Sequence, residues 1–264
     1  MSKYTVKFKE GTQWRGKQGN FQIIKYTNQN NILIRFDCGY EKVTNSKSIS
    51  KGTVKNPFFP TICGKGFIGD GSVYKKGCSE RKTSYYVWKS MLTRCYGGYR
   101  KNRTYSDVTV CDEWLCYTSF EQWFDYNYKE GFHLDKDLKV KGAKVYCPET
   151  CSFIPAEINC ILGYKTYKEG FIYNDLPVGV SYHKKDKKYY SNCNENGLPL
   201  GSSSFDCPVE AFQDYKIKKE DVIKAKANQY FKNLSICKQV YKTLMDWEIV
   251  PFPLEGATPE HCLP

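Results

Sequence analysis

The stretch FHLDKDLKVKGAKVYCPETCSFIPAEINCIL, residues 132–162, decides the middle of the fold. Its first part, His133–Leu138, alternates as a strand does, and a second short strand is expected at Cys151–Ile154. Pro155 suits the first turn of a helix that continues through Asn159. The sequence therefore predicts a strand–strand–helix unit that carries carboxylates on its first strand and an amide on its helix.

The sequence before this stretch is mainly helical in character. A helix is expected from Lys82, a short strand at Val108–Val110 and a second amphipathic helix at Phe120–Tyr128. Four of the six arginines fall between Arg81 and Arg103, and a guanidinium matches the geometry of a phosphate. The candidates for contact with a phosphate backbone are Arg94, Arg100 and Arg103. The alternative is that these arginines form ordinary ion pairs at the protein surface and do not contact phosphate.

Residues 1–70 predict a small β module. Short strands are expected at Phe21–Tyr26 and Ile32–Phe36, separated by the turn-rich Thr27–Asn31. A small barrel-like module fits this pattern. The first 75 residues hold 13 lysines and arginines against 4 acidic residues, so this is the most basic part of the chain. The glycine-rich segment 63–79 is interpreted as a linker, because it lacks the residue order of a phosphate-binding loop.

The last third of the chain predicts a sheet packed on a helix. Strands are expected at Val178–Tyr182, Tyr189–Asn192 and Leu198–Phe205, and Pro208 suits the start of a helix. A further helix is expected within 232–248, where apolar residues recur at helical spacing. The connection between the first two strands reads HKKDKK, so lysines gather at one edge of the expected sheet.

Composition and charge narrow the class of protein. The chain has 264 residues, 41% of them hydrophobic, which allows a buried core and excludes disorder and collagen-like order. No stretch approaches the roughly 20 apolar residues that cross a bilayer, and the N-terminus lacks the apolar segment of a secretory signal. We therefore expect a cytoplasmic protein without membrane contact. The net charge of +12 and the 16% aromatic content favour a nucleic-acid partner, and the codon bias of an AT-rich genome is the alternative.

The 13 cysteines are expected to remain reduced, because disulfides are rare in the cytosol. No pair has the C-x2-C spacing of common zinc sites, and the chain has three histidines. We therefore expect no structural zinc. A four-cysteine site built from Cys95, Cys111, Cys147 and Cys151 is the alternative to small buried thiols.

Six short motifs in the middle of the chain resemble, in their order and spacing, phage-type HNH homing endonucleases. They read WKSMLTRCY (88–96), VTVCDEWL (108–115), FxxWF (120–124), LDKDL (134–138), YCPETCSF (146–153) and EIN (157–159). Each motif alone is weak, and the resemblance extends over residues 82–162. The family pattern has an asparagine where this chain has Thr150.

The resemblance implies a ββα-metal finger that cuts DNA. In that family an aspartate on the first strand and an asparagine on the helix hold one divalent cation, Mg2+ or Mn2+, and these positions fall on Asp135 and Asn159. The family's general base is a histidine next to the aspartate, and this position falls on Lys136, whose ordinary pKa is about 10.4. His133 shares a strand face with Asp135 and is the second candidate base; Asp137 shares that face too and is a candidate metal ligand. The alternative to metal binding is that Asp135 and Asp137 are surface carboxylates paired with neighbouring lysines.

A second resemblance, over residues 177–231, is to the Apetala/ethylene-response-factor DNA-binding domain. It rests on the runs GVSY (179–182), KYY (188–190), LG (200–201) and EAF (210–212). The resemblance implies that a three-stranded sheet lies in the major groove. The residues nominated for DNA contact are Tyr182, Lys184, Lys185, Lys187, Lys188, Tyr190 and Asn192. The family often uses arginine on this sheet and this chain has none there, so phosphate contacts are expected to dominate. The alternative for the lysines at the hairpin tip is that they are only solvated and do not contact DNA.

Taken together, the sequence predicts an α+β, multi-domain chain: a basic β module (1–70), an HNH-like module (80–165) and an Apetala-like module with an extra helix (172–250). The expected function is metal-dependent cutting or nicking of double-stranded DNA, without a small-molecule cofactor. The first alternative is a DNA-binding protein, such as a regulator or an anti-defence factor, that keeps the fold without catalysis. The second alternative is a structural or packaging protein. The oligomeric state stays open.

Overall fold

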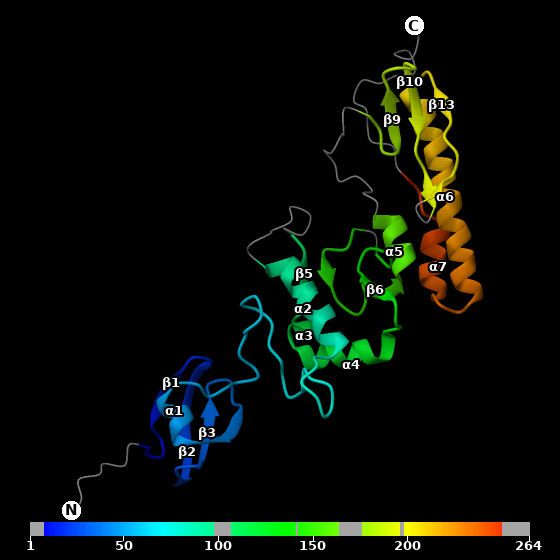
Figure 1. The fold of residues 1–264 in the computed structure, drawn as a ribbon. Helices are drawn as coiled ribbons and strands as arrows, with labels where there is room; N and C mark the ends of the chain where they lie inside the picture. The colour runs from blue at the N-terminus through cyan, green and yellow to red at the C-terminus, as the bar shows by residue number, and fades with distance from the viewer. Residues whose placement is uncertain (1–7, 98–106, 141, 164–175, 196–197, 250–264) are drawn as a thin grey trace, which may run out of the picture. The chain divides into compact units, whose positions relative to one another are not determined.

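The computed structural model describes residues 8–97, 107–140, 142–163, 176–195 and 198–249, and Figure 1 shows their fold. The fold is mixed α+β, as expected from the sequence. Among these residues, no helix combines the length and the apolar character needed to span a bilayer.

The chain divides into two compact units. One unit contains residues 1–127 and 144–147; the other contains 128–143 and 148–264. The segment from 128 to 147 is therefore shared between the two units, and the division cuts across the middle module predicted from the sequence.

The N-terminal sheet is an antiparallel meander in the order β1-β2-β3-β4. Its strands are Gln13–Gly16, Gly19–Asn28, Asn31–Phe36 and Glu41–Thr44, followed by the short helix α1, Ser46–Ser50. Alternate residues of β2 and β3 face one core, whose members are Phe21, Ile23, Ile32, Ile34, Phe36, Ile49 and Val54. The sheet pairs consecutive strands, so in the described residues it is an open meander, not a closed barrel.

The turn between β2 and β3 is tighter than the sequence predicts. The two strands continue to Asn28 and resume at Asn31, which leaves Gln29 and Asn30 as the connection. The side-chain oxygen of Asn28 accepts a hydrogen bond from the backbone nitrogen of Asn30 at 2.9 Å, as asparagine does in tight turns.

The helical part of the first unit is built on aromatic residues. Its elements are α2 (Thr83–Tyr96), β5 (Thr109–Val110), α3 (Asp112–Leu115), α4 (Tyr117–Asn127) and β7 (Val145–Tyr146), which pairs with β5 in parallel. The indole nitrogen of Trp88 donates a hydrogen bond to the Trp114 carbonyl at 2.7 Å, and both indoles are fully buried. This pairing joins α2 to α3 inside one core.

The glycine-rich segment predicted as a linker is packed instead. A side chain at Gly66 would lie 2.3 Å from Leu92 and 2.9 Å from Trp88, and one at Gly69 would lie 2.7 Å from the Cys116 sulfur. Glycine is required where backbone approaches other atoms this closely. The part around Gly66 and Gly69 therefore belongs to the core around α2 and α4, whereas residues 74–79 are exposed.

The second unit begins with a strand–strand–helix arrangement, here called the ββα unit: β6 (Phe132–Asp135), β8 (Ser152–Pro155) and α5 (Ala156–Gly163). The strands are antiparallel, with Asp135 opposite Ser152 and His133 opposite Ile154. The first strand ends at Asp135, three residues before the predicted end at Leu138.

A three-stranded sheet in the order β13-β10-β9 follows, with β9 at Val180–His183, β10 at Lys188–Ser191 and β13 at Ser204–Phe205. The strand predicted at 198–205 is broken into β13 and the separate β12 (Leu198–Pro199), which pairs with β11 (Asn194–Glu195). Two helices close the fold, α6 (Pro208–Lys232) and α7 (Lys238–Met245). Pro208 occupies the first turn of α6, as the sequence predicts.

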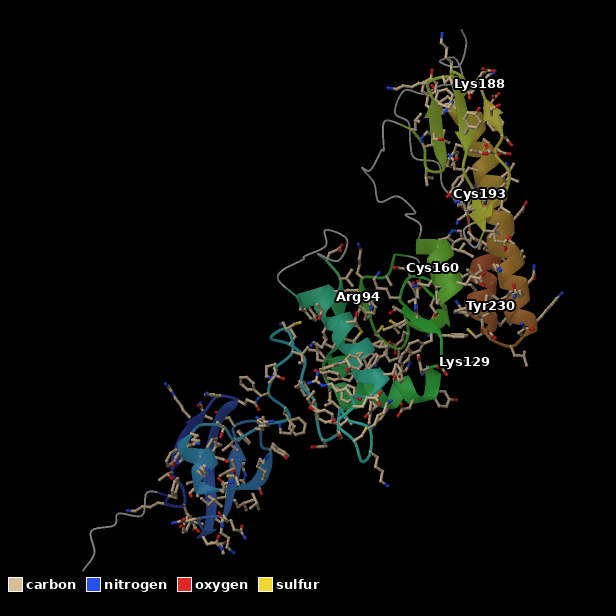
Figure 2. The ribbon with its side chains drawn as sticks, viewed as in Figure 1. Arg94, Lys129, Cys160, Lys188, Cys193 and Tyr230 are labelled. Carbon is tan, nitrogen blue, oxygen red and sulfur yellow. The ribbon has the colours of Figure 1, made fainter. Side chains whose placement is uncertain are left out.

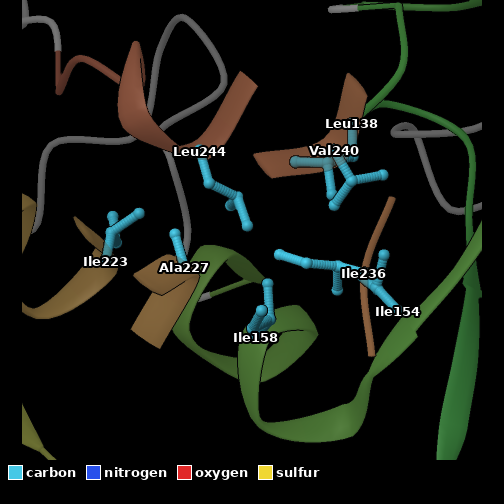
Figure 3. Close-up of a cluster of buried hydrophobic side chains, with 8 residues drawn as sticks. All are labelled: Leu138, Ile154, Ile158, Ile223, Ala227, Ile236, Val240 and Leu244. Atoms are coloured by element: carbon cyan, nitrogen blue, oxygen red, sulfur yellow. The ribbon is translucent and has the colours of Figure 1, made fainter. Parts of the chain in front are cut away.

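Helix α6 contributes to two separate cores. Its first half packs Phe212 and Tyr215 against the sheet, in a cluster with Cys193 and Ile249. Its second half joins a cluster that also contains residues of the ββα unit and α7: Leu138, Ile154, Ile158, Ile223, Ala227, Ile236, Val240 and Leu244 (Figure 3). The ββα unit and the three-stranded sheet are thus both attached to one helix (Figure 1).

Candidate functional site

The ββα unit brings His133 and Asn159 together. His133 and Asp135 lie on the same face of β6, because they are two residues apart on a strand. The side-chain nitrogen of Asn159, on α5, lies 3.2 Å from Nδ1 of His133. An amide nitrogen carries protons and no free lone pair, so it donates and the ring nitrogen accepts.

Asp135 has a structural contact of its own. Its Oδ1 accepts hydrogen bonds from the backbone nitrogens of Asp137 at 3.0 Å and Leu138 at 2.7 Å. These bonds turn the chain and end β6. Burial raises the pKa of Asp135 above its ordinary value, against the opposing effect of the Leu138 hydrogen bond.

Lys136 is buried and fixed within the loop that follows β6. Its amine donates hydrogen bonds to Asp137 at 2.6 Å and to the Ala143 carbonyl at 2.7 Å, and the residue is 7% exposed. The contact with Lys136 also occupies Asp137, the predicted supporting metal ligand. Lys136 and Asp137 therefore stabilise this loop in the structure, whereas His133 and Asn159 contact each other.

Ser152 is a residue that the sequence reasoning missed. It lies opposite Asp135 in the strand pair, on the same face, and is 9% exposed. Its hydroxyl oxygen is buried, and no described group hydrogen-bonds to it. Buried hydroxyls normally have a partner, so this oxygen is a candidate to face a ligand. The sequence signal for it is its place in β8, which is informative only once the register is known.

The donor chemistry of this face fits a hard divalent cation. Asp135 and Asn159 each keep a side-chain oxygen that no described group engages, and Ser152 adds a hydroxyl. Mg2+ prefers oxygen ligands and retains several waters, so a few protein oxygens suffice. Among the described residues, no three His, Cys, Asp or Glu side chains are grouped as metal ligands, and this applies to the four-cysteine alternative as well.

The three-stranded sheet has one covered face and one open face. Val180 packs in the α6 core, and the Ser191 hydroxyl hydrogen-bonds to Asp214 of α6, so these residues define the covered face. The alternation of strands places Tyr182 on that same face, where its ring lies 5.0 Å from the ring of Tyr189. The open face carries Ser181, His183, Lys188, Tyr190 and Asn192.

The open face is ordered by its own hydrogen bonds. Asn192 donates to the Ser181 hydroxyl at 2.9 Å, and Asp186 accepts from Tyr190 at 3.0 Å and contacts His183 at 2.9 Å. The hydrogen bond to Asp186 raises the pKa of Tyr190. The nominated Tyr190 and Asn192 are therefore held in place on one surface.

The hairpin tip between β9 and β10 presents lysines to solvent. Lys184, Lys185 and Lys187 are exposed, and none of them forms an ion pair in the described part of the chain. Lys187 has a φ of 52°, a left-handed conformation that lets the short connection close. Lys188, labelled in Figure 2 on β10, pairs with Asp206 at 2.5 Å.

The first unit offers cations at other places. The guanidinium of Arg94 lies over the Tyr146 ring at 5.5 Å, and that of Arg81 lies over the Tyr85 ring at 4.8 Å. The nominated Arg100 and Arg103 lie outside the described residues. An open hollow of about 750 Å³ is lined by Ser72, Tyr74, Lys75, Lys76, Gly77, Cys78, Ser79 and Lys82.

Comparison with known proteins gives no assignment. No family model matches the sequence, and neither a curated protein nor a solved structure matches it.

Proposed function

We propose that this chain binds double-stranded DNA and cuts or nicks it with one divalent cation, in the manner of the phage-type HNH endonucleases that its sequence resembles. The contact between Asn159 and His133, on the strand face that also holds Asp135, is the observation that carries the proposal. A base, an amide and a carboxylate are the groups that the resemblance implies for cutting DNA with one divalent cation.

DNA binding is assigned to the open face of the β13-β10-β9 sheet and to its hairpin tip. The tip places three lysines beside a face rich in groups that hydrogen-bond. Lysines at such a tip suit the phosphate backbone, and Tyr190 and Asn192 suit the groove edge. The absence of arginine from this sheet favours binding governed by phosphate contacts.

Hydrolysis is assigned to the ββα unit. Asp135 and Asn159 would hold Mg2+ or Mn2+ through their side-chain oxygens, with the Ser152 hydroxyl beside them. The cation, when bound, stabilises the leaving 3′ oxygen of the phosphodiester. His133 takes the proton of the attacking water at Nδ1, once that water has displaced the Asn159 amide from the ring nitrogen.

A DNA-binding protein that does not cut is the second candidate. The family's catalytic histidine position is filled by Lys136, whose amine is buried and bonded to Asp137 and Ala143. An amine that donates to two acceptors inside the loop is not placed to accept a proton from water. If His133 does not act as base, the ββα unit has a purely structural role.

Plasmid nicking separates the two functions. Wild type, Asp135→Ala and Asn159→Ala are compared on supercoiled plasmid with Mg2+ or Mn2+, with Asp221→Ala as control because Asp221 is an exposed aspartate on α6. Nicking by wild type and Asp221→Ala, with loss in the other two, supports hydrolysis. Binding without nicking in every protein supports the second candidate. Absence of salt-sensitive DNA binding overturns both and leaves a structural or packaging role.

A further inference from the structure

We infer that α6 is a spacer that fixes the distance along DNA between the duplex segment held by the sheet and the phosphodiester reached by the ββα unit. The inference rests on the proposed DNA binding and adds a geometric rule to it. Its basis is that one continuous helix is built into the cores on both sides.

The first half of α6 is tightly joined to the sheet. Gly179, beside β9, has a φ of 75°, and a side chain there would lie 2.2 Å from the Tyr215 ring. The Ser191 hydroxyl of β10 hydrogen-bonds to Asp214, which Lys218 also contacts at 2.6 Å. This half of the helix therefore has little freedom to slide relative to the sheet.

The second half of α6 is joined to the ββα unit. Ile223 and Ala227 lie in one buried cluster with Ile154 of β8 and Ile158 of α5, and α7 closes the cluster from another side (Figure 3). Ala227 is fully buried, and Ile158 is 2% exposed. Close-packed interiors transmit position, so α5 should follow α6 as a rigid element.

A polar contact reinforces this junction directly beside the proposed chemistry. Glu157, two residues before Asn159, accepts a hydrogen bond from the Tyr230 hydroxyl at 2.7 Å and pairs with Lys226 at 2.7 Å. Lys226 also lies 3.5 Å from Glu195 of β11. The turn of α5 that carries Asn159 is thus tied to α6 by the three residues Glu157, Lys226 and Tyr230, here called the latch.

The length of the spacer follows from helix geometry. Phe212 in the sheet core and Ala227 in the ββα core lie on one helix, and a rise of 1.5 Å per residue separates them by about 22 Å. For a helix that runs parallel to the duplex axis, at about 3.4 Å per base pair, this corresponds to an offset on the order of 6 base pairs. A protein with such a spacer reaches one phosphodiester at a set distance from its binding site.

The test maps both ends of the spacer on one DNA fragment. An iron–EDTA reagent, which cuts nearby DNA through hydroxyl radicals, is attached to Cys160, an exposed residue of α5, or to Lys185→Cys at the hairpin tip. The other free cysteines are replaced by serine in each full-length protein, and Cys207 is kept because it is disulfide-bonded, contrary to the expectation that all cysteines are reduced. The DNA is a duplex enriched from a random pool by binding to the wild-type protein.

Two narrow groups of cuts with one constant offset support the inference. We expect Ala227→Asp to spread the Cys160 cuts over several neighbouring positions while the Lys185→Cys cuts stay in place. The Lys226→Met/Tyr230→Phe double variant removes the latch without placing a charge in the core. It should widen the same group of cuts at least twofold. The single variant Lys226→Arg keeps a cation at this position and should leave the Cys160 cuts as narrow as in wild type. A loss of stability alone would not move one group of cuts and leave the other.

The possible failures are distinct. If Lys185→Cys cuts at a defined place but the Cys160 cuts are scattered in the wild-type background, DNA binding stands and the spacer is overturned. An unchanged offset in both Ala227→Asp and the latch variant likewise overturns it. If neither reagent cuts the bound duplex, the proposed DNA-binding surface is wrong. The spacer inference, which rests on that surface, is then overturned as well.

Discussion

The side-chain nitrogen of Asn159 lies 3.2 Å from Nδ1 of His133, and this contact determines the state of the imidazole. Because the amide donates, Nδ1 keeps a lone pair and the proton of the neutral ring lies on Nε2. The same orientation leaves the Asn159 oxygen without a hydrogen bond from any described group. The hydrogen bond also occupies the lone pair of Nδ1, which the proposed reaction uses only after the amide has been displaced.

Replacing the two histidines should separate chemistry from binding. We expect His133→Ala to reduce nicking by about 100- to 10,000-fold with unchanged DNA affinity, as for loss of a general base. His183→Ala is the matched control, since His183 lies on the open face of the sheet; it should weaken binding and leave the turnover of bound DNA intact. Gel shift and nicking assays measure the two effects, and equal losses of nicking in both variants would contradict the assignment.

Ser152→Ala should have opposite effects with and without metal. Removing a buried hydroxyl that lacks a partner should leave the metal-free protein equally or slightly more stable, by up to about 1 kcal/mol. If the hydroxyl faces the cation, the same change should weaken Mn2+ binding. Melting curves with and without Mn2+ measure both effects. A variant that is less stable without metal, yet gains the same stability from Mn2+ as wild type, would place Ser152 outside the site.

The lysines of the hairpin tip should govern the salt dependence of DNA binding. Each phosphate contact contributes about 0.9 to the slope of log K against log salt, so Lys184→Ala/Lys185→Ala/Lys187→Ala should lower this slope by about 2 to 3. The control with the same charge change replaces the exposed Lys232, Lys238 and Lys242. Affinities between 50 and 200 mM salt give the slopes. Equal slopes in the two triple variants would show that net charge, and not the tip, drives binding.

The module around α6 should lose stability in acid through Asp214. Burial alone would raise the pKa of Asp214, but hydrogen bonds from Lys218 and Ser191 outweigh it and lower the pKa. The charged carboxylate therefore stabilises the fold above the unfolded pKa of about 3.9, and this contribution is lost as the pH falls through the lower folded pKa. Asp214→Asn should cost about 1–2 kcal/mol at neutral pH and progressively less in acid. Urea unfolding measures the difference, and Asp221→Asn on the same helix should show none.

Gly179 and Gly201 should respond differently to the same substitution. Both have positive φ, 75° and 83°, so alanine costs about 1–2 kcal/mol at either position. At Gly179 the new methyl group also meets the Tyr215 ring, whereas Gly201 has nothing within 4 Å. We expect Gly179→Ala to cost about 3 kcal/mol or more, because overpacking adds to the strain. Denaturant unfolding of both variants checks the difference; similar losses would mean that the ring moves aside.

Local patterns predicted β2 and β3 but not the shorter β1 and β4 of the same sheet. Residues at every second position are buried in the first half of β2 and along β3, and Phe21, Ile23, Ile32 and Ile34 have no exposed surface. Such alternation needs no information from distant parts of the chain. The start of α2 at Thr83, one residue after the predicted Lys82, has the same local origin.

Side-chain hydrogen bonds within a turn and long-range contacts together explain where prediction from the sequence stopped. The strand predicted through Leu138 ends at Asp135, because the carboxylate bonds to the backbone two and three residues ahead. The faces of Tyr182 and Tyr190 differ because α6 covers one side of the sheet, which the strand pattern alone does not tell. The double role of α6 was also missed, since Phe212, Tyr215, Ile223 and Ala227 lie on one continuous face of the helix, and that pattern does not tell that the two halves serve different cores.

The candidate site was predictable only in part. His133, Asp135 and Asn159 were nominated from motifs, and the structure places the first and last in contact. Ser152 required the register of β6 and β8, and the engagement of Lys136 required the path of the loop to Ala143. These two facts depend on pairings that no short motif encodes.

The buried amine of Lys136 limits how this protein can be redesigned. It spans from Asp137 to the Ala143 carbonyl, a reach that needs the full length of a lysine. Histidine at this position, the residue in the HNH pattern that the sequence resembles, is shorter and would leave the carbonyl without its donor. Placing that histidine at position 136 would therefore open the loop beside Asp135 before it could add a proton acceptor. Any gain-of-function redesign has to begin at His133, where an imidazole is already present.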